Sequence, residues 1–129
     1  MPKILVAEDE RDIRELIGFA LRFAEFDVVL AENGAEAVEK ASLEQPDLIL
    51  LDVRMPKMTG YEACRQLKEN PATSNIPIVF LSAKGQESEI EQGLDSGAME
   101  YIVKPFGPAE LADQVKDILQ RAKASAECE

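Results

Sequence analysis

The feature that most constrains the fold is an unbroken apolar run, Leu48 to Leu51, which ends on Asp52. Apolar residues without alternation are typical of a strand that is covered on both faces, as in parallel sheets. Pro56 and Gly60 follow, and they predict a loop rather than a continuing strand. We therefore expect Asp52 where a buried strand opens into a loop, at the edge where open α/β sheets bind ligands.

Short apolar runs of this kind recur along the chain, and most are followed by a stretch with helical periodicity. The predicted strands are residues 4–7, 28–30, 48–51, 78–81 and 101–103. The predicted helices are residues 10–24, 34–43, 61–69, 87–96 and 108–123, with a frayed tail at 124–129. The periodicity predicts a buried face on the first helix made of Ile13, Leu16, Ile17, Ala20 and Leu21.

This regular alternation in 129 residues predicts one α/β domain that spans residues 1–129. Five strand–helix units are too few for an eight-fold barrel, which leaves an open doubly wound sheet. We predict a flavodoxin-like (βα)5 domain whose five-stranded parallel sheet has the strand order 2-1-3-4-5.

The net charge of −11 argues against direct binding to nucleic acid, which needs a basic surface. An acidic surface instead suits a metal cation or a basic partner. No apolar run approaches the roughly 20 residues that cross a membrane. The N-terminus turns acidic too early for a signal peptide. We therefore expect a cytoplasmic protein without membrane insertion.

The chain contains no histidine and two cysteines, Cys64 and Cys128. The absence of histidine excludes His-based triads and imidazole zinc sites within this sequence. The two cysteines lack metal-site spacing, and a disulfide is not expected in the cytoplasm.

Polar side chains follow four of the five predicted strands. Glu8 and Asp9 follow the first strand, Asp52 the third, Ser82 the fourth and Lys104 the fifth. Because the carboxyl ends of parallel strands meet at one edge, we expect these groups to converge. Crowded carboxylates repel one another, and a hard divalent cation relieves that repulsion.

Such a set of groups is suited to phosphoryl chemistry. Asp52 could serve as a metal ligand and as a nucleophile toward phosphorus. Lys104 could neutralise phosphoryl charge, and Ser82 could donate a hydrogen bond.

Each residue also has a simpler interpretation. Glu8 and Asp9 could be acids that stabilise a helix N-terminus. Ser82 could be a turn residue, Lys104 a solvated charge and Tyr101 an ordinary aromatic of an edge strand. The combination favours a site, because the simpler interpretation would have to hold at every strand end separately.

With these features the chain resembles a response-regulator receiver domain, the chemotaxis-regulator-like phosphoacceptor module of two-component signalling. The similarity covers residues 2–123 and rests on Glu8-Asp9, on Asp52 with the following MPKMTG, on Ser82-Ala83 and on Lys104-Pro105. The resemblance implies that Asp52 is the phosphorylation site.

The resemblance also implies roles for the neighbouring residues. Glu8, Asp9, Asp52 and the backbone carbonyl of Arg54 would bind Mg²⁺, with Mn²⁺ as a possible substitute. Ser82 and Lys104 would contact the phosphoryl group, and Tyr101 would be the switch aromatic.

The implied function is a signalling switch that assists its own phosphorylation and dephosphorylation, rather than an enzyme. A histidine kinase or a histidine phosphotransfer protein would donate the phosphoryl group. An output protein, or a second copy of the chain, would dock on the face of residues 87–123.

Three rival interpretations are disfavoured by particular residues. A haloacid-dehalogenase-type phosphatase needs a second Asp two residues after the nucleophile, where this chain has Arg54. A flavin-binding protein needs a phosphate-cradling loop after the first strand, where Glu8, Asp9 and Glu10 would repel phosphate. A degenerate receiver that only docks partners would lack part of the acidic and cationic set.

Overall fold

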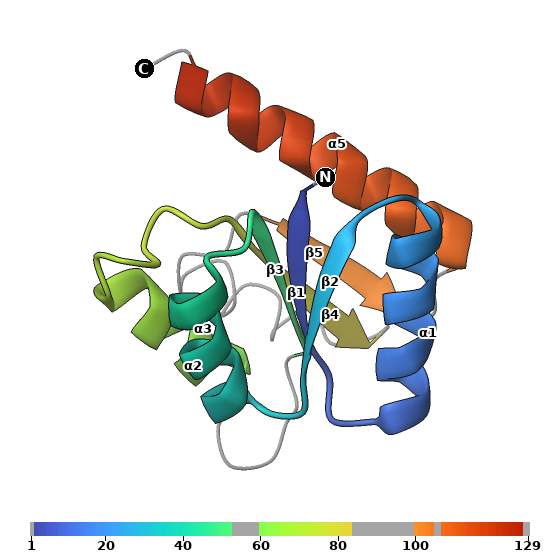
Figure 1. The fold of residues 1–129 in the computed structure, drawn as a ribbon, viewed down its shortest axis with the longest axis horizontal. Coiled ribbons are helices and arrows are strands. Elements are labelled where there is room, and N and C mark those ends of the chain that lie inside the picture. Colours follow the sequence, from blue (N-terminus) through green and yellow to red (C-terminus); the bar gives the residue numbers. More distant parts are fainter. Residues whose placement is uncertain (1, 53–59, 84–99, 105–106, 128–129) are drawn as a thin grey trace.

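The computed structural model describes residues 2–52, 60–83, 100–104 and 107–127 (Figure 1). The elements in these ranges are β1 (Lys3–Ala7), α1 (Arg11–Phe23), β2 (Asp27–Ala31), α2 (Gly34–Glu44), β3 (Leu48–Asp52), α3 (Gly60–Glu69), β4 (Ile78–Ala83), β5 (Glu100–Lys104) and α5 (Pro108–Glu127). The predicted helix at 87–96 lies outside the described residues.

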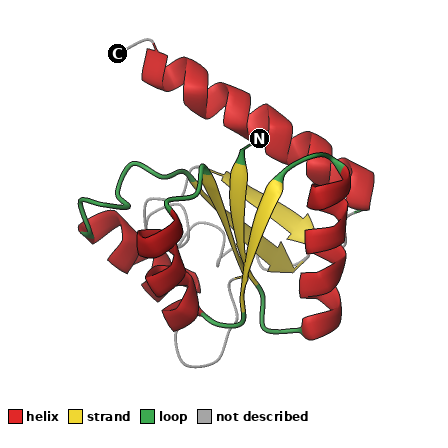
Figure 2. Ribbon diagram, in the orientation of Figure 1, coloured by secondary structure: helices red, strands yellow, loops and turns green. Residues whose placement is uncertain are grey.

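The five strands form one parallel sheet with the order β2-β1-β3-β4-β5 (Figure 2). This order confirms the predicted doubly wound topology. β3 occupies the middle of the sheet, and all five of its residues are buried. Its continuous apolar sequence is therefore explained by helices on both faces of the sheet.

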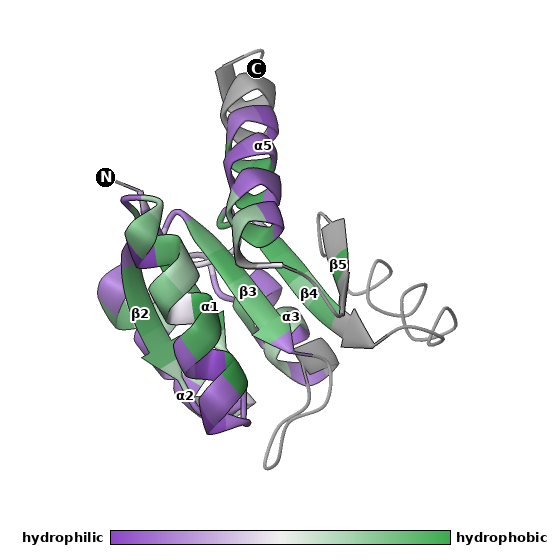
Figure 3. Ribbon diagram, turned by 90° about the vertical axis from the view of Figure 1, so that its right-hand side faces the viewer, coloured by the Kyte–Doolittle hydropathy of each residue, from purple (hydrophilic) through white to green (hydrophobic). Residues whose placement is uncertain are grey.

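Helices cover both faces of the sheet, with α2 and α3 on one side and α1 and α5 on the other (Figure 1). Successive residues of a strand point to opposite faces. Leu5, Ile49 and Phe80 accordingly belong to one buried cluster, while Val6 and Leu50 belong to the other. Figure 3 shows β2, β3 and β4 mainly in the hydrophobic colour, whereas much of α2 and α5 is hydrophilic.

β1 ends at Ala7 as predicted, but the other four strands extend further toward their carboxyl ends than the sequence predicts. Asp52 pairs with Leu81 as the last residue of β3, and Ser82 and Lys104 are residues of β4 and β5. The predicted strands stop before these residues because polar side chains interrupt the apolar runs that define the strands. Backbone pairing does not depend on side-chain polarity, so the ladder continues through them.

Helix α5 continues to Glu127, beyond the predicted end near Lys123 and into the predicted tail. The segment 124–126, Ala-Ser-Ala, includes neither a glycine nor a proline, the residues that commonly end a helix. Alanine is the strongest helix former, so the local sequence supports this extension. No helix within the described ranges is both long and apolar enough to span a membrane.

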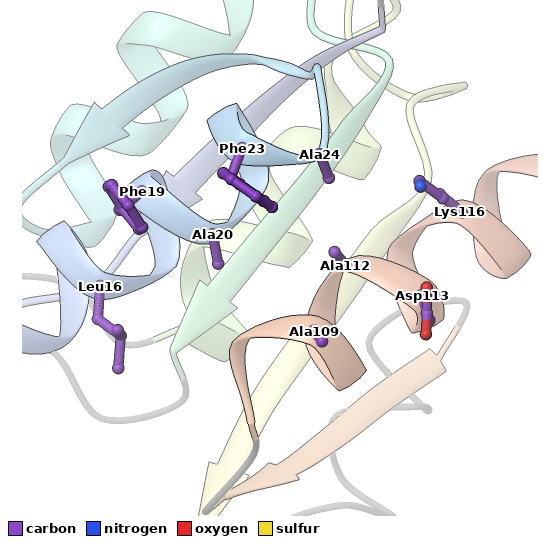
Figure 4. Close-up of a pocket in the computed structure, with 9 residues that line it drawn as sticks. All are labelled: Leu16, Phe19, Ala20, Phe23, Ala24, Ala109, Ala112, Asp113 and Lys116. Atoms are coloured by element: carbon purple, nitrogen blue, oxygen red, sulfur yellow. The ribbon is translucent and has the colours of Figure 1, made fainter.

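The predicted inner face of α1 is wrong at Leu16, which is 45% exposed. Leu16, Phe19 and Phe23 line an open apolar groove of about 490 Å³ opposite Ala109 and Ala112 of α5 (Figure 4). The short side chains of the two alanines leave the space between the helices unfilled. Phe19 and Phe23 stack with ring centroids 6.4 Å apart. The remaining residues of the predicted face are buried or half-buried.

Candidate functional site

Three carboxylates meet at the carboxyl edge of the sheet. Glu8, Asp9 and Asp52 each contribute an oxygen that lies within 4.8 Å of the other two. Their meeting follows from the sheet, because β1 and β3 are neighbours and Ala7 pairs with Leu51. Glu8, which follows Ala7, and Asp52, which follows Leu51, are therefore adjacent, as the sequence predicts.

The three acids differ in exposure. Glu8 is 1% exposed and Asp52 is 8% exposed, whereas Asp9 is exposed. Negative charges held this close repel one another, and burial weakens the screening by water. The exposed side of the cluster leaves a route from solvent for a compensating cation.

The turn that carries two of these acids is held by several hydrogen bonds. The Glu8 backbone N–H donates to the Ala31 carbonyl at 3.1 Å. The Glu8 carbonyl accepts from Arg14 Nη1 at 3.0 Å, and Glu8 Oε1 accepts from the Glu10 N–H at 3.3 Å. Both the main chain and the side chain of Glu8 are thus fixed in place.

The simpler interpretation of Glu8 as an acid near a helix N-terminus also has support. α1 begins at Arg11, and its N-cap Glu10 makes no side-chain capping bond. The Glu8 carboxylate instead accepts from the Glu10 N–H. A carboxylate has two oxygens and several lone pairs, so this bond leaves Glu8 able to bind a cation as well.

The cationic and hydroxyl residues lie on the two strands that follow β3 in the sheet. Ser82 pairs with Val103, and Lys104 pairs with Ala83. Asp52 pairs with Leu81 of β4. Ser82 and Ala83 are the next two residues of β4 toward its carboxyl end. The backbone therefore brings β3, β4 and β5 to the same edge with these residues at their ends.

Of the two remaining predicted residues, Tyr101 lies within the described part of the chain. Tyr101 is the second residue of β5 and pairs with Phe80, three positions before Lys104. Arg54 lies outside the described residues.

The sequence analysis did not single out Arg14, although this residue contacts the acidic turn directly. The available signal was weak: a long cationic side chain in the first turn of a helix that follows two acids. Side chains on a helix tilt toward its N-terminus, so Arg14 can reach back over that turn.

Comparison with known protein families gives one clear match. The family model described as the response regulator receiver domain matches residues 4–116. This range includes all the residues that the sequence analysis proposes for the site.

Curated relatives give a consistent result. The alkaline phosphatase synthesis transcriptional regulatory protein PhoP of Bacillus subtilis is 44% identical over 124 residues, which are 96% of this chain and 51% of PhoP. The chain spans about half the length of the curated relatives it matches.

Two solved structures share the fold over nearly their whole length. The chemotaxis response regulator CheY4 of Vibrio cholerae has a TM-score of 0.86 at 31% identity, covering 92% of this chain and 98% of CheY4. The receiver domain of the sensor histidine kinase PA1611 of Pseudomonas aeruginosa has a TM-score of 0.82 at 34% identity, covering 93% and 95%. The latter structure has a magnesium ion coordinated in its active-site cleft.

Proposed function

Because this chain belongs to the receiver domain family of two-component response regulators, we propose that Asp52 accepts a phosphoryl group in a reaction that depends on Mg²⁺. The observation that carries this proposal is the cluster of three carboxylates, with ligand atoms within 4.8 Å, at the carboxyl edge of the sheet. Asp52 is the member of the cluster that ends the central strand.

The donor set fits a hard divalent cation. Glu8, Asp9 and Asp52 offer only oxygen atoms, and Mg²⁺ prefers carboxylates, waters and phosphate oxygens. The Arg54 backbone carbonyl is the further protein ligand in this proposal. Mn²⁺ accepts the same kinds of donor. A bound divalent ion would offset the negative charge of the acids and of the arriving phosphoryl group.

Asp52 acts as the nucleophile. One of its carboxylate oxygens attacks the phosphorus of a phosphohistidine, forming an O–P bond as the P–N bond breaks and the imidazole leaves. Burial of Asp52 to 8% exposure restricts the directions from which the phosphoryl group can approach. Lys104 and Ser82 contact the transferred oxygens and stabilise their charge.

The donor is a histidine kinase or a histidine phosphotransfer protein, because these 129 residues contain no histidine that could carry the phosphoryl group. The chain is a signalling switch that assists its own phosphorylation and dephosphorylation. Phosphorylation shifts the balance between two conformations through Ser82 and Tyr101, on the neighbouring strands β4 and β5. An output protein or a second copy then docks on the face of residues 87–123.

The first prediction tests Asp52 directly. The protein is incubated with a small phosphodonor and Mg²⁺, and its intact mass is measured. We expect one phosphoryl adduct in the wild type and none in Asp52→Asn or in excess chelator, because the nucleophile or the cation is then missing.

Asp47→Asn is the matched control, since Asp47 precedes the opposite end of the same strand and is exposed. It should be labelled like the wild type. Wild-type labelling of Asp52→Asn, or full labelling in chelator, would contradict the proposal.

A further inference from the structure

We infer that Arg14 is a positioning residue for the acidic cluster, because it holds the peptide unit that joins Glu8 to Asp9. The inference rests on the proposed function, since the affinity it concerns is that of the same site for Mg²⁺. Arg14 itself does not provide a ligand atom.

Arg14 connects the ends of two strands. Its Nη1 donates to the Glu8 carbonyl at 3.0 Å, and its Nη2 lies 3.7 Å from Glu32 Oε1. Glu8 follows β1 and Glu32 follows β2. The Arg14 side chain is only 12% exposed, whereas that of Glu32 is 67% exposed. The guanidinium is therefore held between a buried backbone acceptor and a surface carboxylate.

The position of the Glu8 carbonyl determines where both neighbouring acids point. This carbonyl and the Asp9 nitrogen belong to one planar peptide unit, so a rotation of the unit moves both residues. The Ala31 carbonyl holds Glu8 from its N–H side, and Arg14 holds it from its carbonyl side. Loss of Arg14 leaves the carbonyl side without this charge-assisted donor.

The identity of the residue matters because arginine and lysine bind differently. The planar fork of arginine presents two nitrogens in fixed directions, which suits simultaneous contact with Glu8 and Glu32. A lysine ammonium is a single point on a flexible chain. Arg14→Lys therefore keeps the charge but loses the fixed geometry.

Charge and position predict opposite effects on metal binding. A cation close to the cluster repels Mg²⁺, so removing its charge alone would tighten binding. Removing the anchor of the Glu8–Asp9 peptide weakens binding, because the carboxylates are no longer held at the separation the ion requires. The sign of the change in Kd therefore separates the two roles.

The test is a titration of wild-type and variant proteins with Mg²⁺, followed by the backbone amide shifts of residues 8–10. We expect Arg14→Ala to raise the Kd about tenfold, which is typical for loss of a group that orients metal ligands. Arg14→Lys should give an intermediate increase.

Arg11→Ala is the matched control. Arg11 lies on the same helix, but its Nε pairs with Glu15 at 3.2 Å and its side chain is 79% exposed. The Kd of Arg11→Ala for Mg²⁺ should equal that of the wild type. An unchanged or lower Kd in folded Arg14→Ala would overturn the inference.

Two further variants keep the test decisive if Arg14→Ala fails to fold. A raised Kd in Arg14→Lys supports positioning, and wild-type Kd values in both Arg14→Lys and Glu32→Gln overturn it.

The metal-free proteins separate this inference from the proposed function. If the wild type binds no Mg²⁺, the proposed function fails. Metal-free Arg14→Ala still supports positioning if it shifts the amides of residues 8–10 and Arg11→Ala does not.

Discussion

Cys64 shows how strongly burial changes the chemistry of a single side chain in this protein. It lies on α3, fully buried in the cluster that also contains Leu67 and Ile78. Burial raises the pKa of its thiol from 9.0 to about 11, and the positive charges of Lys68 and Arg65 lower it to a smaller extent. Burial also lowers the pKa of Lys68.

A titration of Cys64 tests this environment. In a Cys128→Ser variant, the ¹³C shift of the Cys64 Cβ should keep its thiol value to about pH 10, where an ordinary thiol is largely ionised. The reason is that burial disfavours the charged thiolate, so ionisation moves upward toward pH 11. The denatured protein serves as the control and should titrate near 9.0. A native midpoint near 9.0 would contradict the buried environment.

Sequence alone was sufficient to predict that Glu8, Asp9 and Asp52 converge, because strand order and direction determine that result. It was not sufficient to predict the contact of Arg14 with the acidic turn or the exposure of Leu16. The role of Arg14 depends on how far a side chain reaches back over a turn. The exposure of Leu16 depends on the small residues that α5 presents to α1. Both are properties of packing between elements, which periodicity within one element does not contain.

The first two helices begin in different ways. The Asn33 side chain caps α2 by accepting from the Glu36 N–H at 2.8 Å. Glu10, the N-cap of α1, makes no such side-chain bond. The start of α1 is instead joined to the acidic turn through the bond from the Glu10 N–H to Glu8. The start of α1 is thus anchored by a residue of the acidic cluster.

This difference predicts that mutations at Asn33 and at Glu10 lower the free energy of unfolding by different amounts. Asn33→Ala should lower the free energy of unfolding by about 1 kcal/mol, because it removes a capping acceptor. Glu10→Ala removes no capping bond and should cost clearly less. Urea denaturation of the metal-free proteins measures both, and Asn33→Asp should retain most of the stability. Equal losses in Asn33→Ala and Glu10→Ala would refute this account of the caps.

The number and order of the strands were predictable, but their ends were not. The change from apolar to polar residues at Asp52 and Lys104 predicts that β3 and β5 stop before them. They are paired members of β3 and β5, because the neighbouring strand continues to offer hydrogen-bonding partners at that level. Strand ends therefore depend on residues far away in the sequence.

At the scale of the whole molecule, the proposed switch connects the acidic cluster to the edge of the sheet formed by β5. β4 and β5, which carry Ser82 and Tyr101, lie on one side of the central strand, and β5 is the edge strand of the sheet. A coupling of about 1–3 kcal/mol between two sites changes affinity roughly 5- to 150-fold. In the proposed switch, a coupling of that size between Asp52 and the output face would change the affinity for the partner by the same factor.

The location of the response can be measured. Addition of fluoroberyllate, which mimics the phosphoryl group, should change amide shifts mainly between residues 82 and 115, apart from the acidic cluster itself. The physical reason is that the proposed switch acts through Ser82 on β4 and Tyr101 on β5, so the change would reach the elements beside these two strands. Asp52→Asn should show no such response. Changes concentrated on α1 and α2 would mean that the output face is elsewhere.

β1 and β3 are neighbours in the sheet, although α1, β2 and α2 separate them along the chain. The acids that follow β1 and the acid that ends β3 form one cluster only when these strands are paired. A divalent ion held there would act as a non-covalent cross-link that closes the loop from residue 9 to residue 52. Unlike a disulfide, this link needs no oxidation, and a chelator removes it without breaking a covalent bond.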